Sequence, residues 1–437
     1  MLTKTILKNL LNVKHTAVDD ITFNSNGSIT VRVHPTKGEK CRCGICRRKA
    51  PRYDYGRGTR LWRTCDWNTH MVFIEAESPR VACPEHGVVT AAVPWARHDS
   101  MFTYEFEQMV SWLAVNCSKK VVASFMRIAW NTVGLIISRV RKDVDYDPSK
   151  RFDGLVNIGV DETSYKKGHK YITVVVNHDT GKVIWVSEGH GKTIFTKFFK
   201  QLSDEQLSSI KLVSGDGARW IQGCMDKFCP DATRCIDPFH VVQWAVEALD
   251  KVRSSAWNDA RKKTAKQPKR KVGRPFKDAP KPDTTAKDIK SSKYPLGKDP
   301  ENLTENQRAT LELIAKKDKR LYRAYLLKEE LRLVFQHDYD SGRKQLDHFI
   351  KWAQHCRIQE FVDLQRKIRR HYDAILATLE HKLSNARIEA VNNKIKLTIR
   401  MAYGFRNINS MIDMIMLRCS DINVKLPWEA QAVTHTS

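Results

Sequence analysis

Residues 155–177 read LVNIGVDETSYKKGHKYITVVVN, and this stretch decides the fold class. Its two β-branched runs, LVNIGV and YITVVVN, are typical of strands. A third run of this kind, KVIWVSE at residues 182–188, follows. A helical segment, TIFTKFFKQL, then precedes two further strand candidates, IKLVSGD at 210–216 and ATRCID at 232–237. Three strands, a helix, a strand, a helical stretch and a last strand follow the order of an RNase H-like fold, so we expect a multidomain α/β protein built around it.

Acidic residues end two of these strands. Asp161 ends the first and Asp216 the fourth, while Glu389 lies in SNARIEAVNNKIK, which has a helical pattern. Two strand-end aspartates and a helical glutamate can hold two Mg²⁺ (or Mn²⁺) ions for in-line displacement at phosphorus, because hard cations prefer carboxylate oxygens. We therefore predict that Asp161, Asp216 and Glu389 are the catalytic metal ligands.

Two other acids compete for places in this site. Glu162 is next to Asp161, and adjacent strand residues point to opposite faces, so only one of them can join; we expect Asp161. Asp237 ends the fifth strand, with His240 beside it, and is a fourth candidate. A single aspartate at a strand end is more often a turn residue, but three acids at the right places of one fold favour a site.

Polar residues follow Glu389 at helical spacing. Asn392 and Lys396 share its face of the helix, and Arg400 is close to that face. An acid flanked by an amide and cations suits a metal ligand that also meets phosphate. We therefore expect Asn392, Lys396 and Arg400 to bind DNA; a solvated charged face is the alternative.

The chain of 437 residues is strongly basic. It has 75 Lys and Arg against 49 Asp and Glu, a net charge of +26. Such a surplus favours a polyanion, usually nucleic acid, as partner over a merely soluble basic protein. No apolar run is long enough for a membrane span, and the N-terminus lacks the pattern of a signal peptide. We expect a cytoplasmic protein that does not use a membrane.

Two short metal-binding motifs lie in a strand-rich region before residue 98. Cys43 and Cys46 form one Cys-x₂-Cys pair, and Cys83 and His86 form a Cys-x₂-His pair. Two chelating pairs of this spacing are what tetrahedral structural Zn²⁺ requires. Cys41 and Cys65 are spare and could substitute, and other cysteines stand singly, as expected of reduced thiols.

A helix pair follows the zinc motif. KKVVASFMRIAWNTVGLIISRVRKD predicts a helix, a turn near residues 129–131 and a second helix capped by Asn131 or Thr132. Recognition helices carry polar residues at the start and an apolar rear face, here Val133, Leu135, Ile136 and Ile137. We predict a helix-turn-helix in which Asn131, Thr132, Arg139 and Arg141 contact DNA. Two packed helices of any bundle would look similar.

A basic segment and a helical block separate the fifth strand from Glu389. Residues 261–298 are rich in Lys, Arg and Pro without apolar periodicity, which predicts a flexible segment. Within it, KRKVGRPFK resembles an AT-hook that places Arg274 in a minor groove, although a plain basic linker explains it equally well. Helices from Thr304 to about Leu383 then predict an insertion in the catalytic domain.

These patterns divide the chain into five parts. We expect a zinc-binding β-rich module at 1–98, a helix-turn-helix at 99–150, the first part of an RNase H-like domain at 151–255, a basic linker and helical insertion at 256–383, and the C-terminal helices of the catalytic domain at 384–437.

Taken together, these segments resemble bacterial insertion-sequence transposases of the DDE class, in particular the ISL-three family. The resemblance rests on the cysteine–histidine finger, the helix pair and four further segments: GVDETSYKKGHKY, DPFHVVQWAVEALDKVR, KSSKYPLGKDPENLTENQ and NARIEAVNNKIKLTIRMAYGFRN. The resemblance implies terminal-repeat binding by the finger and helix pair and a DDE triad at Asp161, Asp216 and Glu389. SGDGARW matches the family poorly around Asp216, and the finger has a histidine where four cysteines are common.

The resulting expectation is a transposase. It would bind terminal inverted repeats and target DNA as a homodimer or higher oligomer at the bacterial nucleoid. It would nick element ends with water and join strands with a DNA 3′-OH. A structure-selective nuclease of the same fold, a non-catalytic DNA-binding regulator derived from an element, and an RNA-directed nuclease are the alternatives.

Overall fold

The computed structural model describes residues 2–145, 147–266, 283–382, 386–402, 404–405 and 407–432. The chain divides into two compact units. The first contains Met1–Pro148 and Asn393–Ser437, and the second contains Ser149–Asn392. Each is described by itself below, and together they confirm the predicted multidomain α/β class.

The first unit begins with a helix and a four-stranded sheet of order β1-β2-β5-β4. The elements are α1 (Leu2–Leu11), β1 (Thr16–Phe23), β2 (Ile29–Pro35), β4 (Thr59–Arg63) and β5 (Val72–Glu77). β1 and β2 form an antiparallel hairpin whose turn contains Asn26 and Gly27. Inward-facing strand residues such as Val31 and Ile74 pack with Trp62 and Trp95, whose rings meet edge to face.

A second, three-stranded sheet of order β3-β6-β7 carries the cysteine motifs. Its strands are β3 (Arg52–Asp54), β6 (Arg80–Cys83) and β7 (Gly87–Thr90). The β6–β7 turn holds Cys83 and His86, and the loop that precedes β3 holds Cys43 and Cys46. Few apolar residues support this small sheet, so a cross-link through the motifs would add much of its stability.

The helical part of the first unit comprises α2 (Tyr104–Asn116), α3 (Lys119–Phe125), α4 (Trp130–Val144), α17 (Ile408–Cys419) and α18 (Pro427–Ala432). α2, α3 and α4 share one core with α17, which contributes Met414 and Leu417. The predicted cap of α4 is wrong, because Ala129 occupies the N-cap without a side-chain hydrogen bond. The predicted packing of Leu135 is also wrong, since this side chain is 61% exposed.

A five-stranded sheet of order β10-β9-β8-β11-β12 forms the centre of the second unit. Its strands are β8 (Asn157–Lys166), β9 (Lys170–Asn177), β10 (Lys182–Glu188), β11 (Leu212–Gly215) and β12 (Thr233–Ile236). β9 is antiparallel to β8 and β10, whereas β11 is parallel to both β8 and β12. All five strands match the sequence prediction, and their order and directions are those of an RNase H-like fold.

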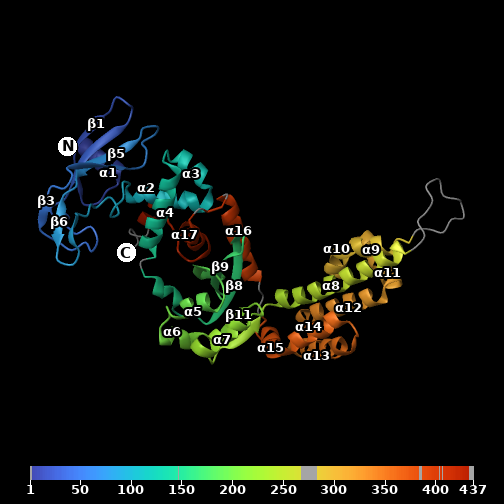
Figure 1. Cartoon of the computed structure of the whole chain (residues 1–437). Helices are drawn as coiled ribbons and strands as arrows, with labels where there is room; N and C mark the ends of the chain where they lie inside the picture. The colour runs from blue at the N-terminus through green and yellow to red at the C-terminus, as the bar shows by residue number, and fades with distance from the viewer. Residues whose placement is uncertain are drawn as a thin grey trace, which may run out of the picture. The chain divides into compact units, whose positions relative to one another are not determined.

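Helices cover both faces of this sheet (Figure 1). They are α5 (Lys192–Phe199), α6 (Asp204–Ser209), α7 (Arg219–Phe228), α15 (Tyr372–Glu380) and the start of α16 (Ala386–Met401), whose residues from Asn393 onward belong to the first unit. Phenylalanines of α5 and apolar residues of α7 pack against alternate residues of β8, namely Ile158 and Val160. The intervening residue Gly159 faces the opposite way, toward α16, where a Cβ would collide with Ile388.

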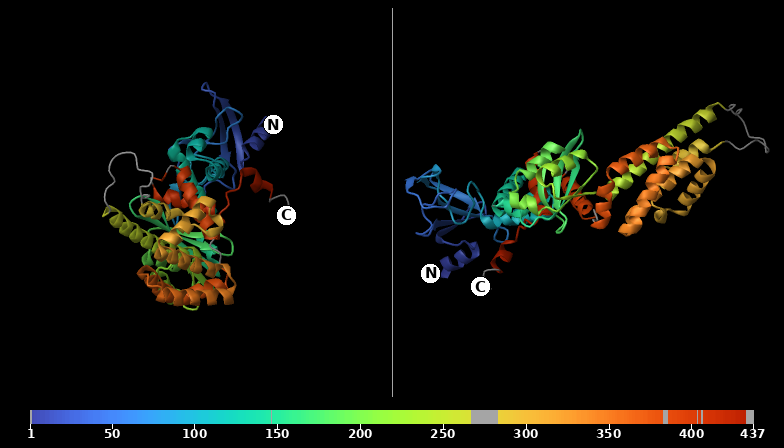
Figure 2. Two further views of the ribbon diagram at one scale, coloured as in Figure 1. Left: turned by 90° about the vertical axis from the view of Figure 1, so that its right-hand side faces the viewer. Right: turned by 90° about the horizontal axis from the view of Figure 1, so that it is seen from below.

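The helical insertion is present as predicted and packs as a bundle, drawn in yellow and orange in Figure 2. It contains α8 (Pro238–Ala265), α9 (Thr285–Ser291), α10 (Lys293–Gly297), α11 (Glu305–Lys317), α12 (Lys319–Leu333), α13 (Tyr339–His355) and α14 (Gln359–Arg370), with a short 3₁₀ turn, η2 (Pro300–Asn302), before α11 and another, η3 (Val334–Gln336), after α12. A 3₁₀ turn η1 (Pro148–Phe152) leads into the second unit.

The prediction of a flexible segment over 261–298 is wrong for the described residues. α8 continues to Ala265, and α9 and α10 bury Ile289 and Leu296 in the core of the bundle. Because many lysines surround these two apolar residues, the sequence shows no apolar periodicity from which the helices could be predicted. Residues 269–277, with Arg274, lie outside the described residues.

Among the described helices, none has by itself the length and apolar character of a membrane span, although α3 and α4, which meet at a bend of 101°, would have them if joined.

Candidate active site and zinc centre

The predicted catalytic aspartates lie at the same edge of the sheet. β8, β11 and β12 are parallel neighbours, with Ser214 beside Gly159 and Gly215 beside Ile236. Asp161 lies two residues beyond Gly159 in β8, Asp216 directly follows β11, and Asp237 directly follows β12. The prediction that Asp161 ends its strand is wrong, because β8 continues to Lys166 and pairs with β9 beyond this residue. Asp161 lies within β8, at the level where the shorter neighbours β11 and β12 end and are followed by Asp216 and Asp237.

Asp161 and Glu162 have different partners, as their alternation on β8 requires. The Asn392 amide of α16 donates a hydrogen bond to Asp161 Oδ2, and Thr163 Oγ1 donates to Asn392 Oδ1 over 3.3 Å. Glu162 Oε1 instead accepts the backbone N–H of Gly191, 2.7 Å away, just before α5. Asp161 and Thr163 therefore face α16, and Glu162 faces α5.

The electrostatics of Asp161 suit a cation ligand. Burial raises the pKa of its carboxyl, and the hydrogen bonds from the Glu162 N–H and from Asn392 oppose this rise only in part. The charge of Asp237 raises the pKa further, and that of His240 lowers it. A divalent cation would stabilise the ionised form of a carboxylate in these surroundings.

Asp216 and Asp237 are engaged differently. Asp237 uses both carboxylate oxygens: Oδ1 accepts the N–H of Phe239 at 2.8 Å, capping α8, and Oδ2 contacts His240 Nδ1 at 2.9 Å. This contact with Asp237, and then the charges of Asp161 and Asp216, raise the pKa of His240. For Asp216, Oδ1 accepts the N–H of Ala218 at 2.9 Å.

Arg234 is a site neighbour that the sequence prediction missed. From β12 its guanidinium donates to three backbone carbonyls: Val213 at 3.2 Å, Cys235 at 2.8 Å, and Asp216. Burial lowers its pKa to about 10. The signal in the sequence was an arginine inside the otherwise apolar strand ATRCID.

Glu389 lies in the first turn of α16 and is exposed. Its neighbour Ile388 is 4% exposed and lies over Gly159, and Asn392 bonds Asp161 one turn later. The start of α16 is thus fixed over the Asp161 strand. Among the described residues, the set of three or more possible metal ligands that lie within 4.8 Å of one another is that of the finger, and the predicted triad does not form such a set.

The finger ligands form the metal centre that the motifs predicted. Cys46 Sγ and Cys83 Sγ are 3.8 Å apart, and His86 Nδ1 lies 3.6 Å from Cys83 Sγ and 3.8 Å from Cys43 Sγ. Zn–S bonds of about 2.3 Å and Zn–N bonds of about 2.0 Å in a tetrahedron require ligand separations of about 3.5–3.8 Å. The hydrogen bond with His86 lowers the pKa of the Cys83 thiol, which favours the thiolate that Zn²⁺ binds.

The two spare cysteines are not part of this centre. The four clustered ligands are Cys43, Cys46, Cys83 and His86, without Cys41 or Cys65. Burial raises the pKa of Cys65 to about 12, so this thiol stays protonated. None of the cysteines forms a disulfide, as expected of reduced thiols.

The residues predicted to contact DNA divide into two groups. Asn131, Lys396 and Arg400 are exposed, and Thr132 is partly exposed near the start of α4. Arg139 and Arg141 instead make internal ion pairs. Arg139 Nη2 lies 2.6 Å from the fully buried Glu107, and Arg141 contacts Asp145 at 3.2 Å and Asp413 at 3.4 Å. These two arginines stabilise the helix-turn-helix core, and the structure gives no support to their role on DNA.

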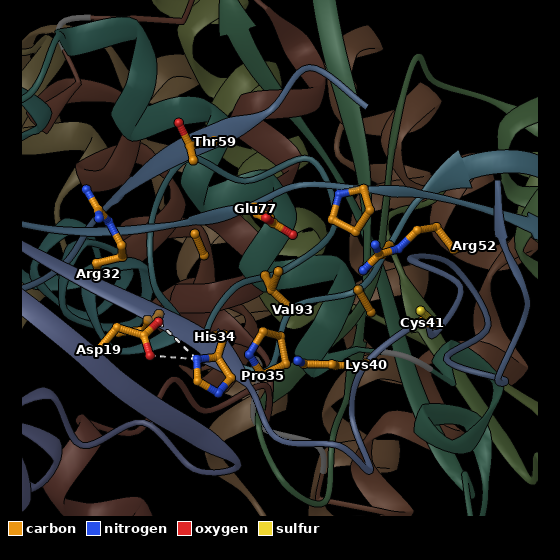
Figure 3. Close-up of a pocket in the computed structure, with 15 residues that line it drawn as sticks. Asp19, Arg32, His34, Pro35, Lys40, Cys41, Arg52, Thr59, Glu77 and Val93 are labelled. Atoms are coloured by element: carbon orange, nitrogen blue, oxygen red, sulfur yellow. Dashed lines mark hydrogen bonds and ion pairs between the residues drawn. The ribbon is translucent and has the colours of Figure 1, made fainter. Parts of the chain in front are cut away.

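A cavity of about 480 Å³ lies between the two sheets of the first unit (Figure 3). Both signs of charge line it: Arg32, Lys40 and Arg52 against Glu77 and Asp19, which contacts His34 at 2.9 Å. Arg32 is itself paired with Glu75 at 3.0 Å. Because these charges largely offset one another, the cavity lacks the positive field that a phosphate backbone would need.

Three family models match successive parts of the chain. A zinc-finger of transposase IS204/IS1001/IS1096/IS1165 matches residues 39–86, a helix-turn-helix domain of transposase family ISL3 matches 91–141, and an ISL3 transposase domain matches 158–415. The second and third matches span the predicted helix pair and all three acids of the predicted triad.

Curated relatives are also insertion-sequence transposases. The chain is 48% identical over 430 residues to the transposase for insertion sequence element IS1557 of two Mycobacterium tuberculosis strains, covering 97% of both chains. It is 28% identical over 317 residues to the transposase for insertion sequence element IS1001 of Bordetella parapertussis, covering 72% of both. A solved Drosophila P element transposase strand transfer complex matches at 8% identity and a TM-score of 0.36, over 73% of this chain and 92% of that one, which is too remote to carry an argument.

Proposed function

Because this chain belongs to the ISL3 family of insertion-sequence transposases, we propose that it binds the terminal inverted repeats of its own element and catalyses metal-dependent cleavage and strand transfer of DNA. The single observation that supports the chemistry best is the position of the acids. Asp161 lies within β8, beside the end of the parallel strand β11 that Asp216 follows, and α16, which carries Glu389, is bonded through Asn392 to Asp161.

The donor set fits hard divalent cations. Asp161, Asp216 and Glu389 offer only carboxylate oxygens, which Mg²⁺ and Mn²⁺ prefer. When bound, two such ions would activate the attacking oxygen and stabilise the leaving oxygen of an in-line displacement. The chain's own residues would fix the geometry: Asn392 orients the Asp161 carboxylate, and Ala218 N–H and Arg234 hold the Asp216 carboxylate and backbone.

The same site serves both proposed reactions. Water is the nucleophile when an element end is nicked, and the released DNA 3′-OH is the nucleophile when the strand is joined to target DNA. Each step breaks one phosphodiester bond and forms one P–O bond, so joining needs no cofactor for energy. The carboxylates take no part as nucleophiles, and no covalent bond between protein and DNA is required.

End recognition is assigned to the first unit. The finger and the α3–α4 pair lie in the same unit. The start of α4 carries Asn131, which is exposed, and Thr132, which is partly exposed. Polar side chains at the start of a recognition helix read base edges in the major groove. We expect the protein to act as a homodimer or higher oligomer on the paired ends of the element.

The test is nicking of a labelled duplex that carries the terminal repeat. The wild-type protein should nick it with Mg²⁺ or Mn²⁺ and not with EDTA, and should not nick a shuffled duplex at a defined position. Asp161→Asn and Glu389→Gln should bind the repeat as tightly as wild type but lose nicking. Asp259→Asn, which alters an exposed carboxylate on α8, should keep full activity. Equal activity of Asp161→Asn and Asp259→Asn would refute the assignment.

A further inference from the structure

A pocket of about 730 Å³ lies beside the end of β11 in the second unit. Its walls come from the first turns of α7, from β12, and from the corner between α14 and α15, elements that are neighbours in Figure 1. Arg219, Arg234 and Arg370 line it, together with His371. These residues come from separate parts of the chain, so the fold and not a local charge run brings the arginines together.

The arginines of this pocket lack acidic partners. Within the described residues, neither Arg219 nor Arg370 takes part in an ion pair, and both are exposed. Arg234 donates to backbone carbonyls and not to a carboxylate. In a chain where most buried or half-buried arginines are paired, three unpaired guanidinium groups around one cavity leave a concentrated positive field.

Two acids also line the pocket, against three arginines, so its lining keeps a net positive charge. Asp226 Oδ1 accepts a hydrogen bond from Gln222 at 2.8 Å, and Asp373 is exposed to solvent. The imidazole of His371 responds to the balance of charges. Burial lowers its pKa, and the charges of Lys367, Arg234, Arg370 and Arg219 lower it further. The lowered pKa of His371 agrees with the excess of arginines over acids in the lining of the pocket.

The pocket adjoins the predicted second catalytic aspartate. Arg234 binds the Asp216 carbonyl. The next residue, Gly217, lies against Trp244, and a Cβ added to it would also be 3.5 Å from His371 Nε2. Asp216 itself caps the backbone at Ala218, next to Arg219. An anion in the pocket would therefore sit beside the backbone that positions Asp216.

We propose that this pocket binds a backbone phosphate of the DNA strand close to the cleavage site. The proposal rests on the proposed function, which supplies DNA as substrate. Arginine forks match phosphate oxygens in pairs, and a phosphate held here would fix the position of the strand relative to Asp216. A free anion such as inorganic phosphate or ATP shares this chemistry, so the experiment must separate the two sources.

The experiment compares two double variants that remove the same charge. The pocket pair is Arg219→Gln with Arg370→Gln. The control pair is Arg366→Gln with Arg369→Gln, which are exposed residues of α14 outside the pocket. Binding to the end-containing duplex is measured in EDTA over a range of salt concentrations, so that it does not depend on catalysis. Single-turnover nicking is then measured at saturating DNA with Mg²⁺.

The pocket pair should bind more weakly, with a slope of log K against log[salt] that is shallower by about one than that of the control pair. Nicking at saturating DNA should fall about tenfold for the pocket pair and stay unchanged for the control pair. Equal losses for both pairs would show a general effect of charge and overturn the proposal, as would no loss for either.

The second arm tests the free anion. Thermal unfolding is followed with inorganic phosphate and with ATP, each up to millimolar concentration. If the pocket binds DNA, neither phosphate nor ATP should raise the melting temperature of the wild-type protein in a saturable way that is lost in the pocket pair. Saturable stabilisation lost in the pocket pair, with DNA binding unchanged, would assign the pocket to a free anion and overturn the DNA assignment. Failure of the proposed function is distinguishable, because wild-type protein would then bind the duplex but leave it uncut with Mg²⁺.

Discussion

The side-chain amide of Asn392 donates a hydrogen bond to the carboxylate of Asp161, a residue 231 positions earlier in the chain. This bond ties the helix of the predicted catalytic glutamate to the strand of the first catalytic aspartate. Asn392 was expected on phosphate; the structure places it on the carboxylate, where it orients the group and stabilises its charge. Because its amide is bonded to Asp161, Asn392 could contact DNA only from its position beside this carboxylate.

Asn392→Ala should lower single-turnover nicking about 10- to 100-fold with little change in DNA binding, since partners that orient a metal ligand typically have effects of this size. The Mg²⁺ concentration that gives half-maximal rate should rise. Loss of the bond should also raise the pKa of Asp161 further. As the pH is lowered, the variant should therefore lose its activity at a higher pH than the wild type does.

Asn392→Gln is the conservative comparison and should recover part of the rate, because it keeps the amide. If Asn392→Ala weakened DNA binding in EDTA and left the Mg²⁺ dependence unchanged, Asn392 would be a DNA contact and not a positioning residue.

Gly159→Ala should impair the site through packing. A methyl group at this position would collide with Ile388 Cδ1 and lie 2.8 Å from His178 Nε2, so α16 would be displaced from β8. We expect a lower melting temperature and a loss of nicking. Ile388→Val removes the Cδ1 atom and should partly restore both in the double variant. Gly223→Ala, where the nearest atom is 3.6 Å away, should be tolerated, and an equal effect of the two glycine substitutions would contradict this explanation.

Zinc should be held by the four clustered ligands alone. Cys83→Ser should lower the zinc content below one equivalent and weaken binding to terminal-repeat DNA, because the small β3-β6-β7 sheet has little apolar core. Cys41→Ser is the matched control and should retain full zinc and binding. The second unit should keep its melting transition in both proteins. One equivalent of zinc retained by Cys83→Ser would show that the centre is wrongly assigned.

Glu105→Gln should stabilise the first unit in a pH-dependent way. Glu105 Oε2 is buried and has no hydrogen-bond partner among the described residues, and burial raises the pKa of this carboxyl. The folded protein therefore holds this proton more tightly than the unfolded chain, and wild-type stability falls as the pH rises through the interval between the two pKa values.

Thermal unfolding at neutral pH should show a higher melting temperature for Glu105→Gln, by roughly 2–4 °C for each kcal/mol regained in a unit of this size. The difference should vanish at a pH below the ordinary pKa of glutamate, where the wild-type side chain is also neutral. A difference that is constant with pH would indicate a packing effect instead.

The sheet and its acids were predictable because strands have local signatures. Five β-branched runs in RNase H-like order predict the parallel β8-β11-β12 neighbours, and aspartates that close the β-branched runs then lie at one level of the sheet. The end of β8 was not predictable, because the polar residues that follow Asp161 extend the strand to Lys166. The Cys-x₂-Cys and Cys-x₂-His pairs were predictable for the same reason, since each chelating loop is complete within four residues. What the sequence supplied in each case was a short pattern whose geometry does not depend on distant residues.

Contacts between distant elements were not predictable. Nothing near Arg139 shows that α2 would bring the buried Glu107 against it, and nothing near Arg141 points to Asp413 on α17. Spacing on α4 cannot tell a DNA-facing arginine from one covered by another helix. Arg234 was missed likewise, because its partners are backbone carbonyls of the neighbouring strand.

The final prediction separates the two strand-end aspartates that compete for the second catalytic position. Asp216→Asn should lower nicking by about 10²-fold or more, because it removes a charged ligand of the divalent cations that would stabilise the reacting phosphate. Asp237→Asn should cost less than tenfold, since asparagine also caps helices and can still accept from Phe239 N–H. Both variants should bind end-containing DNA normally in EDTA.

The contrast between these two aspartates follows from their positions. Asp237 already uses both oxygens on its own helix and on His240, whereas Asp216 follows the strand next to β8. If Asp237→Asn were inactive and Asp216→Asn active, Asp237 and His240 would replace Asp216 in the site, and the metal would be held on β8 and β12 with the strand between them left out.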